Sequence, residues 1–455
     1  MTSPFSTFQV AEPARNIPLF GAFDVVVLGG GPAGIAAASA AARNGSRVLL
    51  VERYGFLGGM GTAAGVTNFC GLHANIHGEI QQVVHGVADD LLDRMRALDG
   101  LNEPHLVLGK TFAQAYDMSA FKCAADSLLL ADGVQLLFHA LAAGVVKSED
   151  GKLDAVLLET KSGRVAVRGR CFIDCSGDAD LVHWAGVPSE KGDESGQMLY
   201  PTLMFRVGEV DAAAAGEAWR TIPTLMDDAQ AAGEYSFPRR GAVVRPQKRA
   251  YEWRVNVTQL TNEDGSATDG TDAASLSSGE VLGRRQIVDY LLFLREKVPG
   301  FNNAYVLDIA PQIGIRETRR LIGEYMLTAE DVLTCADFED SIGVNGWPLE
   351  KHVAGDVKWE WPPIPESRGY NQLPYRMLLP KRSTVHGVDN LLVAGRCASM
   401  THDGQSAARV TGACFVMGQA AGTAAAIALS TGTSVHEIDR AELQRRLAAQ
   451  GAYLG

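Results

Sequence analysis

The chain has 455 residues, 46% hydrophobic and 21% charged, which is enough for two or three packed units and does not fit a disordered protein. Acidic side chains outnumber basic ones 53 to 41, and the formal net charge of -12 argues against a nucleic-acid partner because a polyanion would be repelled. The seven cysteines include no CxxC pair, so neither a disulfide framework nor a zinc site is indicated.

Targeting signals are not evident in the sequence. Residues 1–22 contain Glu12, Arg15 and three prolines and have no continuous apolar core, so they do not read as a signal peptide. The most apolar stretches, near Val25 and Ala420, are interrupted by glycines and are expected to be too short to cross a bilayer. We therefore expect a cytoplasmic protein without a membrane anchor.

The first predicted unit is a strand, a helix and a second strand. Residues 24–28 (DVVVL) form an apolar run that stops at glycines, as a buried parallel strand does. The Ala-rich segment 35–43 favours a helix, and residues 46–51 form a second apolar strand. The pattern predicts a βαβ unit.

A phosphate-binding pattern lies inside this unit. Gly29, Gly31 and Gly34 make GxGxxG directly after the strand and at the start of the helix, where the N–H groups of a helix N-terminus can bind a pyrophosphate. Glu52 ends the next strand, where a carboxylate can accept both hydroxyls of an adenosine ribose and disfavours a 2′-phosphate. NADP is therefore disfavoured, and this motif alone does not separate NAD from FAD.

The middle of the chain alternates between helices and strands. Residues 91–98 and 118–130 read as helices, and residues 134–175 as short strands that end in an apolar strand, 171–175. From Leu199 the strands LMFRV and YEWRVNV, a polar loop near 262–278 and a helix over 280–297 suggest a separate substrate-facing domain.

In the last part of the chain, residues 347–375 and residues 390–429 differ in composition and in periodicity. Residues 347–375 are rich in Pro and Trp, which suggests an ordered loop over a site. Its aromatic residues either wall that site or pack the loop against itself: Trp347, Trp359, Trp361 and Tyr370. Residues 390–429 return to strand, turn and helix, and a C-terminal helix is expected in 433–455.

Four ordered segments carry a family resemblance: 24–59, 172–186, 311–332 and 390–428. Together they resemble the bacterial FAD-dependent oxidoreductase family, which is distantly related to the succinate dehydrogenase and fumarate reductase flavoproteins. The resemblance implies an α/β protein in which a Rossmann-type, glutathione-reductase-like FAD-binding domain (17–198 and 376–432) is joined to a mixed α+β substrate or cap domain (199–375). Residues 211–247 and 347–370 match the pattern least, so the identity of the substrate does not carry over.

The resemblance also implies the residues that hold a non-covalent FAD. The strand end at Ser176, Gly177 and Asp178 would lie beside the adenosine and pyrophosphate, and the helix that begins near Val410 would direct its positive end at the flavin pyrimidine. The full predicted cofactor set is Gly29, Gly31, Pro32, Ala33, Gly34, Glu52, Arg53, Gly59, Met60, Ser176, Gly177, Asp178, Gly395, Arg396, Arg409, Val410 and Gly412.

Three residues are predicted to act on the substrate. Arg316 matches an arginine typical of the family and would clamp a substrate carboxylate or an anionic flavin oxygen, unless it pairs with Glu317 or Glu324. His402 is of a residue type suited to proton transfer at neutral pH, although a surface-loop histidine is its alternative. Asp403 stands where the family usually has glutamate.

Two further patterns leave alternatives open. Cys70 follows a Gly-rich segment that in this fold passes close to the isoalloxazine. In that position we expect its thiol to be a redox nucleophile, a covalent flavin anchor or an inert packing residue. His73 and His77 have the spacing of metal ligands on a helix, but no third ligand accompanies them, so no metal is predicted.

No second strand-GxGxxG-helix unit is found in the sequence, so a built-in NAD(P)H domain is not expected. The function predicted is hydride transfer between a small organic substrate and flavin N5, with an unknown electron acceptor or donor and a possible homo-oligomer. The alternatives are a flavin monooxygenase and an FAD-containing electron-transfer subunit.

Overall fold

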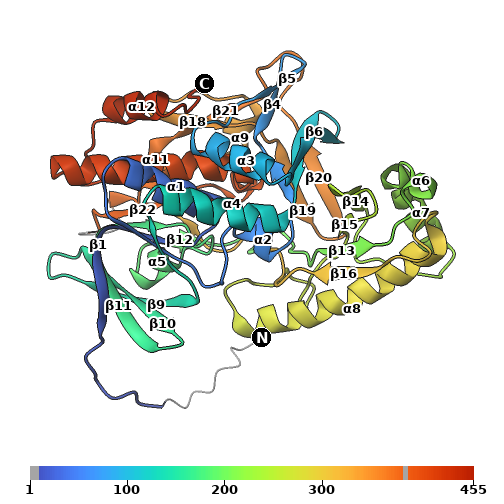
Figure 1. Ribbon diagram of the computed structural model, residues 1–455, viewed down its shortest axis with the longest axis horizontal. Helices are drawn as coiled ribbons and strands as arrows, with labels where there is room; N and C mark the ends of the chain where they lie inside the picture. Colours follow the sequence, from blue (N-terminus) through green and yellow to red (C-terminus); the bar gives the residue numbers. More distant parts are fainter. Residues whose placement is uncertain (1–9, 383–387) are drawn as a thin grey trace.

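The computed structural model describes residues 10–382 and 388–455 (Figure 1). The signal-peptide prediction rested on residues 1–22, of which 1–9 lie outside the described residues. The chain forms an α/β protein with a mixed sheet at its centre and a second, antiparallel sheet to one side.

The central sheet has seven strands in the order β8-β2-β1-β11-β10-β9, with β22 paired to β11. The pairs β2/β8, β1/β2, β1/β11 and β11/β22 are parallel, and β11/β10 and β10/β9 are antiparallel. The bounds are β1 Leu19–Leu28, β2 Val48–Val51, β8 Gln135–Leu137, β9 Ala140–Lys147, β10 Leu153–Thr160, β11 Gly163–Asp174 and β22 Leu391–Val393. β22 pairs with β11, the strand that also pairs with β1, so a late segment of the chain joins the same sheet as the first strand.

The last four residues of β1, Val25 to Leu28, are all apolar because both faces of the sheet are covered here. Val25 and Val27 belong to the core shared with the helices, whereas Val26 and Leu28 pack in a second cluster with β10 and β11 on the other face. The helices beside the first face are α1 (Pro32–Arg43), α3 (Val87–Ala97), α4 (Met118–Ala131) and α11 (Thr411–Thr431).

α11 packs closely along α1 (Figure 1). A Cβ on Gly418 would lie 2.0 Å from the Ala33 carbonyl oxygen, and one on Gly422 would lie 2.1 Å from that of Ala37. Only glycine allows the two backbones to come this near.

The expectation about apolar runs was wrong at α11, because this helix of 21 residues is long and apolar enough to span a membrane by length and composition. Most of α11 is buried inside the protein, which accounts for a helix that is apolar all round.

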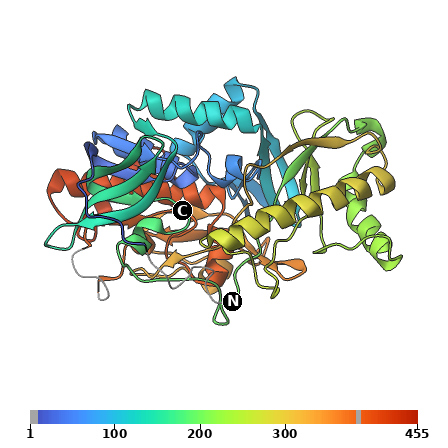
Figure 2. The same cartoon turned by 90° about the horizontal axis from the view of Figure 1, so that it is seen from below.

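The second sheet, called the cap sheet here, has the order β14-β15-β13-β16 and is antiparallel throughout. The cap elements are β13 Phe205–Gly208, α6 Ala212–Ala215, α7 Ala218–Ala231, β14 Val243–Pro246, β15 Trp253–Asn256, α8 Ala273–Lys297 and β16 Tyr305–Ile309. Figure 2 shows this group beside the central sheet, with α8 running along its length. Its own core includes Phe205, Val255 and Phe293.

The remaining elements of the described chain are a three-stranded sheet, two-stranded pairs and short helices. The three-stranded sheet comprises β3 Asn68–Cys70, β6 Leu101–Leu108 and β7 Thr111–Tyr116. The two-stranded pairs are β4 His73–Ile76 with β5 Glu79–Gln82, β12 Ser189–Glu190 with β17 Arg320–Leu321, β18 Ser341–Asn345 with β21 Asn371–Pro374, and β19 Leu349–Val353 with β20 Asp356–Glu360. The short helices are α2 Met60–Ala63, α5 Asp180–Trp184, α9 Ala329–Leu333, η1 Tyr375–Leu378, α10 His402–Ala408 and α12 Arg440–Ala449.

The two cores divide the chain differently from the predicted domain boundaries. The cap core draws its buried residues from Leu203 to Ile315. Three residues that were expected in the cap pack instead with α1 and α11, in the core that also contains Val25 and Val27: Leu327, Val344 and Leu373. Predicted loop 262–278 also contains the start of α8, which begins at Ala273 behind an Asp272 cap.

Candidate functional site

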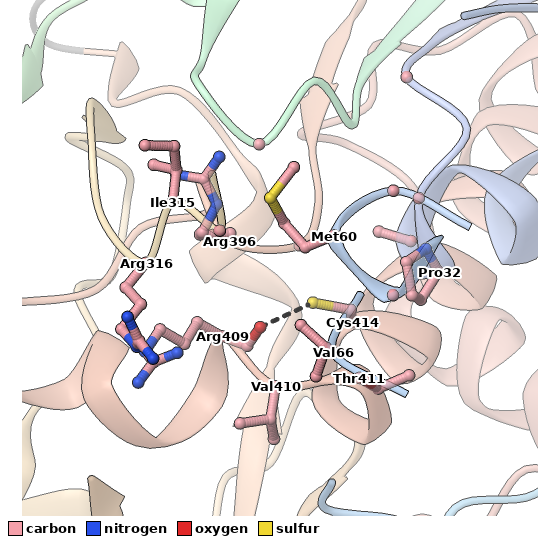
Figure 3. Close-up of a pocket in the computed structure, with 18 of the residues that line it drawn as sticks. Pro32, Met60, Val66, Ile315, Arg316, Arg396, Arg409, Val410, Thr411 and Cys414 are labelled. Carbon is pink, nitrogen blue, oxygen red and sulfur yellow. Dashed lines mark hydrogen bonds between the residues drawn. The ribbon is translucent and has the colours of Figure 1, made fainter. Parts of the chain in front are cut away.

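A large cavity lies between the central sheet and the cap sheet. It encloses about 1650 Å³ of space not filled by protein atoms, including the part open to solvent at its mouth. Its walls come from the glycine loop after β1, the N-terminus of α11, the three-stranded sheet and the cap sheet. Figure 3 shows Met60, Val66 and Ile315 around this space, together with the side chains of Arg316 and Arg409.

The glycine loop has the conformation that its sequence predicts. Gly29 has φ +97°, and a Cβ there would lie 2.4 Å from the Cys175 carbonyl oxygen. A Cβ on Gly34 would lie 1.8 Å from the Gly29 carbonyl oxygen, so Gly34 serves the close packing of α1 on the loop. Gly31 is the N-cap of α1, Pro32 follows it, and no side chain caps the helix. The free N–H groups at this end therefore open onto the cavity.

α11 offers a second helix N-terminus to the same cavity. Val410 is its N-cap, again without a side-chain cap, and Val410 and Thr411 line the cavity. Neither α1 nor α11 has an acidic residue in its first turn. Two positive helix ends that face one cavity without local neutralisation form a site suited to an anionic ligand.

Glu52 lies buried at the end of β2. Its Oε2 accepts a hydrogen bond from the Gly30 N–H at 2.7 Å, and its Oε1 accepts one from the Tyr54 N–H at 3.0 Å. An ionised carboxylate has about four acceptor positions, so the two that remain can accept the hydroxyls of a ligand. Glu52 also lines the cavity.

The structure brings most of the predicted cofactor residues together. Those that line the cavity are Gly29, Gly31, Pro32, Ala33, Glu52, Arg53, Gly59, Met60, Ser176, Gly177, Gly395, Arg396, Arg409 and Val410. Gly34, Asp178 and Gly412 do not line it. A Cβ on Gly412 would lie 2.1 Å from the Gly71 carbonyl oxygen, so this glycine allows α11 to approach the loop after β3.

Asp178 holds two arginines of the cavity wall instead of facing the cavity. Its Oδ1 accepts from Arg396 Nη2 at 2.8 Å, and Arg53 Nη1 lies 3.8 Å from its Oδ2. Burial alone would raise the pKa of Asp178, but Arg396 and Arg53 outweigh this effect and hold the pKa below its usual value. The carboxylate thus fixes the position of both guanidinium groups.

His402 and Asp403 do not line the cavity. His402 Nδ1 lies 2.8 Å from Oε2 of the fully buried Glu317, and Asp403 pairs with Lys351 Nζ at 3.1 Å. These partners come from distant segments, which sequence spacing did not reveal. The catalytic roles of His402 and Asp403 stay predictions, and His402 is held by a buried carboxylate.

Arg316 does line the cavity and is only 7% exposed. Its Nη1 donates to the Tyr200 carbonyl oxygen at 2.7 Å. The alternative ion pairs do not form, because Glu317 pairs with Arg320 and His402, and Glu324 accepts from the Arg382 N–H. Burial, with the nearby Arg239 and Arg409, moves the pKa of Arg316 well below its usual value.

The structure adds residues that the sequence analysis did not select. Arg254 on β15, and Glu350 and His352 on β19, line the cavity beside Arg316 and Arg409. A charged residue inside the apolar strand YEWRVNV was the one available signal for Arg254.

Glu350 and His352 form a hydrogen-bonded pair in which the histidine is buried. Glu350 Oε1 lies 3.0 Å from His352 Nε2, and its Oε2 accepts from Trp347 Nε1 at 3.0 Å. Arg239 Nη1 lies 3.3 Å from His352 Nδ1 and can only donate, so Nδ1 accepts and Nε2 carries the proton to Glu350. Burial opposes ionisation of Glu350, yet His352, Arg409 and Arg316 bring its pKa to about 2. Burial and Arg316 move the pKa of His352 well below its usual value, consistent with a neutral ring.

Cys70 lies on β3 and faces the cavity. Burial, with the nearby Glu350 carboxylate, raises the pKa of its thiol to about 12. A thiol with this pKa is protonated at neutral pH and is a poor nucleophile, which favours the packing role over thiol chemistry.

The aromatic residues of 347–375 divide into two groups. Trp347 and Trp359 line the cavity. Trp361 stacks on Trp359 with 5.7 Å between ring centroids and donates to Thr111 Oγ1, and the Tyr370 hydroxyl lies 2.8 Å from that of Tyr453. Trp347 and Trp359 therefore border the site, whereas Trp361 and Tyr370 serve packing.

His73 lies on β4, and His77 follows that strand, so the two are not on a helix as their spacing had suggested. Within residues 10–382 and 388–455, no group of three or more His, Cys, Asp or Glu side chains is arranged to hold a metal ion.

Comparison with known proteins gives a family match over nearly the whole chain. Residues 24–447 match the family described as FAD dependent oxidoreductase. A digeranylgeranylglycerophospholipid reductase from Thermoplasma volcanium is 28% identical over 177 residues, which are 37% of this chain and 42% of that protein. The chain thus matches less than half the length of this curated relative.

Two of the solved structures that are similar to this chain are a reductase-like protein and a monooxygenase. A geranylgeranyl bacteriochlorophyll reductase-like protein from Thermoplasma acidophilum has a TM-score of 0.47 at 15% identity, over 94% of this chain and 83% of that one. p-Nitrophenol 4-monooxygenase from Pseudomonas putida DLL-E4 has a TM-score of 0.48 at 13% identity, over 94% and 84% of the two chains. Likeness at this level says nothing about substrate or reaction.

Proposed function

This chain belongs to the FAD-dependent oxidoreductase family, and from that premise we propose that it transfers a hydride between a small organic substrate and N5 of a non-covalently bound FAD. One observation carries the proposal. One cavity connects two uncapped helix N-termini and the buried Glu52 with polar and aromatic side chains from the cap sheet and from β19 and β20.

The residues present fit FAD by their chemistry. The N–H groups at the start of α1 would bind the pyrophosphate, because they lack side-chain partners and face the cavity. Glu52 would accept the ribose hydroxyls with the acceptor positions that Gly30 and Tyr54 leave free. The positive end of α11 would lie at the flavin pyrimidine. We extend the proposal to the fold, with β1-α1-β2 and β22-α11 forming a Rossmann-type FAD-binding domain of the glutathione-reductase kind.

FAD supplies the redox chemistry when it is bound, and the chain's own residues orient the substrate and exclude water. Val66, Met204 and Ile315 form an apolar wall that limits water beside the reacting atoms. Arg316 binds negative charge, and Arg409 does so next to the N-terminus of α11. We do not assign a proton-transfer role to His402, because Glu317 holds its Nδ1 outside the cavity.

The test is to purify the protein and measure the flavin that it contains. Protein purified or reconstituted with FAD should be yellow, release FAD on denaturation and lose its flavin absorbance anaerobically when a suitable organic donor is added. A colourless protein that cannot be reconstituted would overturn the proposal. NAD(P)H oxidation coupled to a hydroxylated product would favour the monooxygenase, and bleaching by a protein donor alone would favour an electron-transfer subunit.

A further inference from the structure

Three arginines lie side by side across the cap sheet. Arg245 on β14 is paired in register with Arg254 on β15, and Arg254 is paired with Arg206 on β13. Directly opposed residues of antiparallel strands point to the same face, where like charges destabilise the sheet. Three adjacent arginines are therefore expected to need negatively charged groups close to them.

Among the residues that the structure describes, carboxylates compensate this charge at one end of the row only. Arg206 Nη2 lies 2.5 Å from Asp308 Oδ2, and its Nη1 lies 3.3 Å from Glu252 Oε2. Arg245 donates to backbone carbonyl oxygens, Val107 O at 3.2 Å and Val244 O at 3.4 Å. Arg254, in the middle, is the member of the row that lines the cavity.

Arg254 is buried and has no carboxylate partner in the part of the chain that the structure describes. It is 3% exposed, its Nη1 donates to the Val66 carbonyl oxygen at 2.5 Å, and its Nε is buried without a hydrogen-bond partner. With the Asn68 amide turned to satisfy both of its polar atoms, the amide oxygen accepts from Arg254 Nη2 at 2.9 Å. These neutral partners orient the guanidinium group but leave its charge unbalanced.

Arg316 and Arg409 add to this charge, and Figure 3 shows both side chains extending toward the same part of the cavity. Glu350 is the carboxylate of this region, and its Oε2 lies 4.0 Å from Arg409 Nη2. In the chain from 10 to 382 and from 388 to 455, no carboxylate forms an ion pair with Arg254 or Arg316. Because a buried charge without a counter-ion is costly, this end of the cavity is built to receive negative charge.

We propose that Arg254 and Arg316 bind the anionic group of the substrate, which makes the substrate an organic acid or organic phosphate. The inference rests on the proposed function, since the group bound here belongs to the molecule that exchanges a hydride with the flavin. The phosphates of the cofactor do not supply the negative charge, because they are assigned to the N-terminus of α1. Val107, Val243, Trp347 and Trp359 line the cavity beside the arginines and accommodate an apolar or aromatic part. In a chain of net charge -12, such a local positive site selects for an anion that fits it.

The experiment measures binding of simple probes to the FAD-loaded protein by calorimetry. Benzoate carries a carboxylate on an aromatic ring, phenyl phosphate carries a phosphate, and benzamide is the neutral match. We expect saturable binding of at least one of the two anions, with benzamide at least tenfold weaker. The anion that binds more tightly identifies the head group. Arg254→Gln should weaken anion binding by about tenfold to a hundredfold, and Arg254→Lys should recover part of the loss.

Arg206→Gln is the matched control, because Arg206 belongs to the same row but is neutralised by Asp308. It should bind the anion within twofold of the wild-type protein. The melting temperature gives a second readout: benzoate or phenyl phosphate should raise that of the wild-type protein but not that of Arg254→Gln, and without an anion Arg254→Gln should be no less stable than the wild type.

Equal binding of benzamide and the anions, or unchanged anion binding in both Arg254→Gln and Arg316→Gln, would overturn the anion site. Absence of saturable binding of either anion at millimolar concentration would overturn it as well. These results leave the FAD content unaffected. Failure of the proposed function is seen separately, as protein that holds no FAD whatever anions it binds.

Discussion

Glu52→Gln is the most informative single change at the cofactor end of the cavity. The carboxylate accepts from two backbone N–H groups, Gly30 at 2.7 Å and Tyr54 at 3.0 Å, with a different oxygen for each. A glutamine has one acceptor oxygen, and the NH₂ group that takes the place of the other carboxylate oxygen cannot accept from a backbone N–H or from a ribose hydroxyl of FAD. Hydrogen bonds to a charged group contribute roughly 1.5–3 kcal/mol, so FAD affinity should fall by about tenfold to 150-fold.

The assay is titration of the FAD-free protein with FAD, followed by quenching of flavin fluorescence, together with a thermal melt of each variant. Glu159→Gln is the control, because Glu159 lies on β10 of the same sheet and does not line the cavity. It should bind FAD as the wild type does. If Glu52→Gln bound FAD within twofold of the wild type while remaining folded, the carboxylate would not be the ribose acceptor and the assignment of this end of the cavity would be wrong.

Two further predictions concern packing and the thiol. Gly418→Ala should destabilise the protein by about 1–3 kcal/mol in a denaturant titration, because its Cβ would lie 2.0 Å from the Ala33 carbonyl oxygen and force α11 from α1. Gly144→Ala is the control, because its Cβ makes an ordinary 3.4 Å contact. An equal loss of stability in Gly144→Ala would contradict the reasoning. Cys70→Ser should keep FAD and turnover. At pH 8 iodoacetamide should label the exposed Cys123 much faster than Cys70, because a thiol pKa of about 12 leaves almost no thiolate at Cys70. Comparable labelling of the two cysteines in peptide mass spectrometry would show that Cys70 is a reactive thiol.

Local patterns in the sequence were sufficient for the glycine loop and its surroundings. β1, α1 and β2 follow one another within 33 residues, and hydrophobic periodicity, glycine spacing and proline position all act between near neighbours. Glu52 could be selected because its distance from Gly34 along the chain is fixed by one helix and one strand. The same holds for the start of α11 at Val410, where a buried strand and a following helix mark the site.

Only the tertiary structure decided the composition of the other end of the cavity. Arg254, Arg316 and Glu350 come from three segments that meet because the cap sheet and the β19-β20 hairpin fold over the central sheet, and no spacing rule relates them. His402 looked suitable by residue type and position, but a buried Glu317, 85 residues earlier in the chain, holds it elsewhere. Local motifs set the backbone that receives a cofactor, whereas the charges around a substrate depend on which side chains long-range packing leaves without a partner.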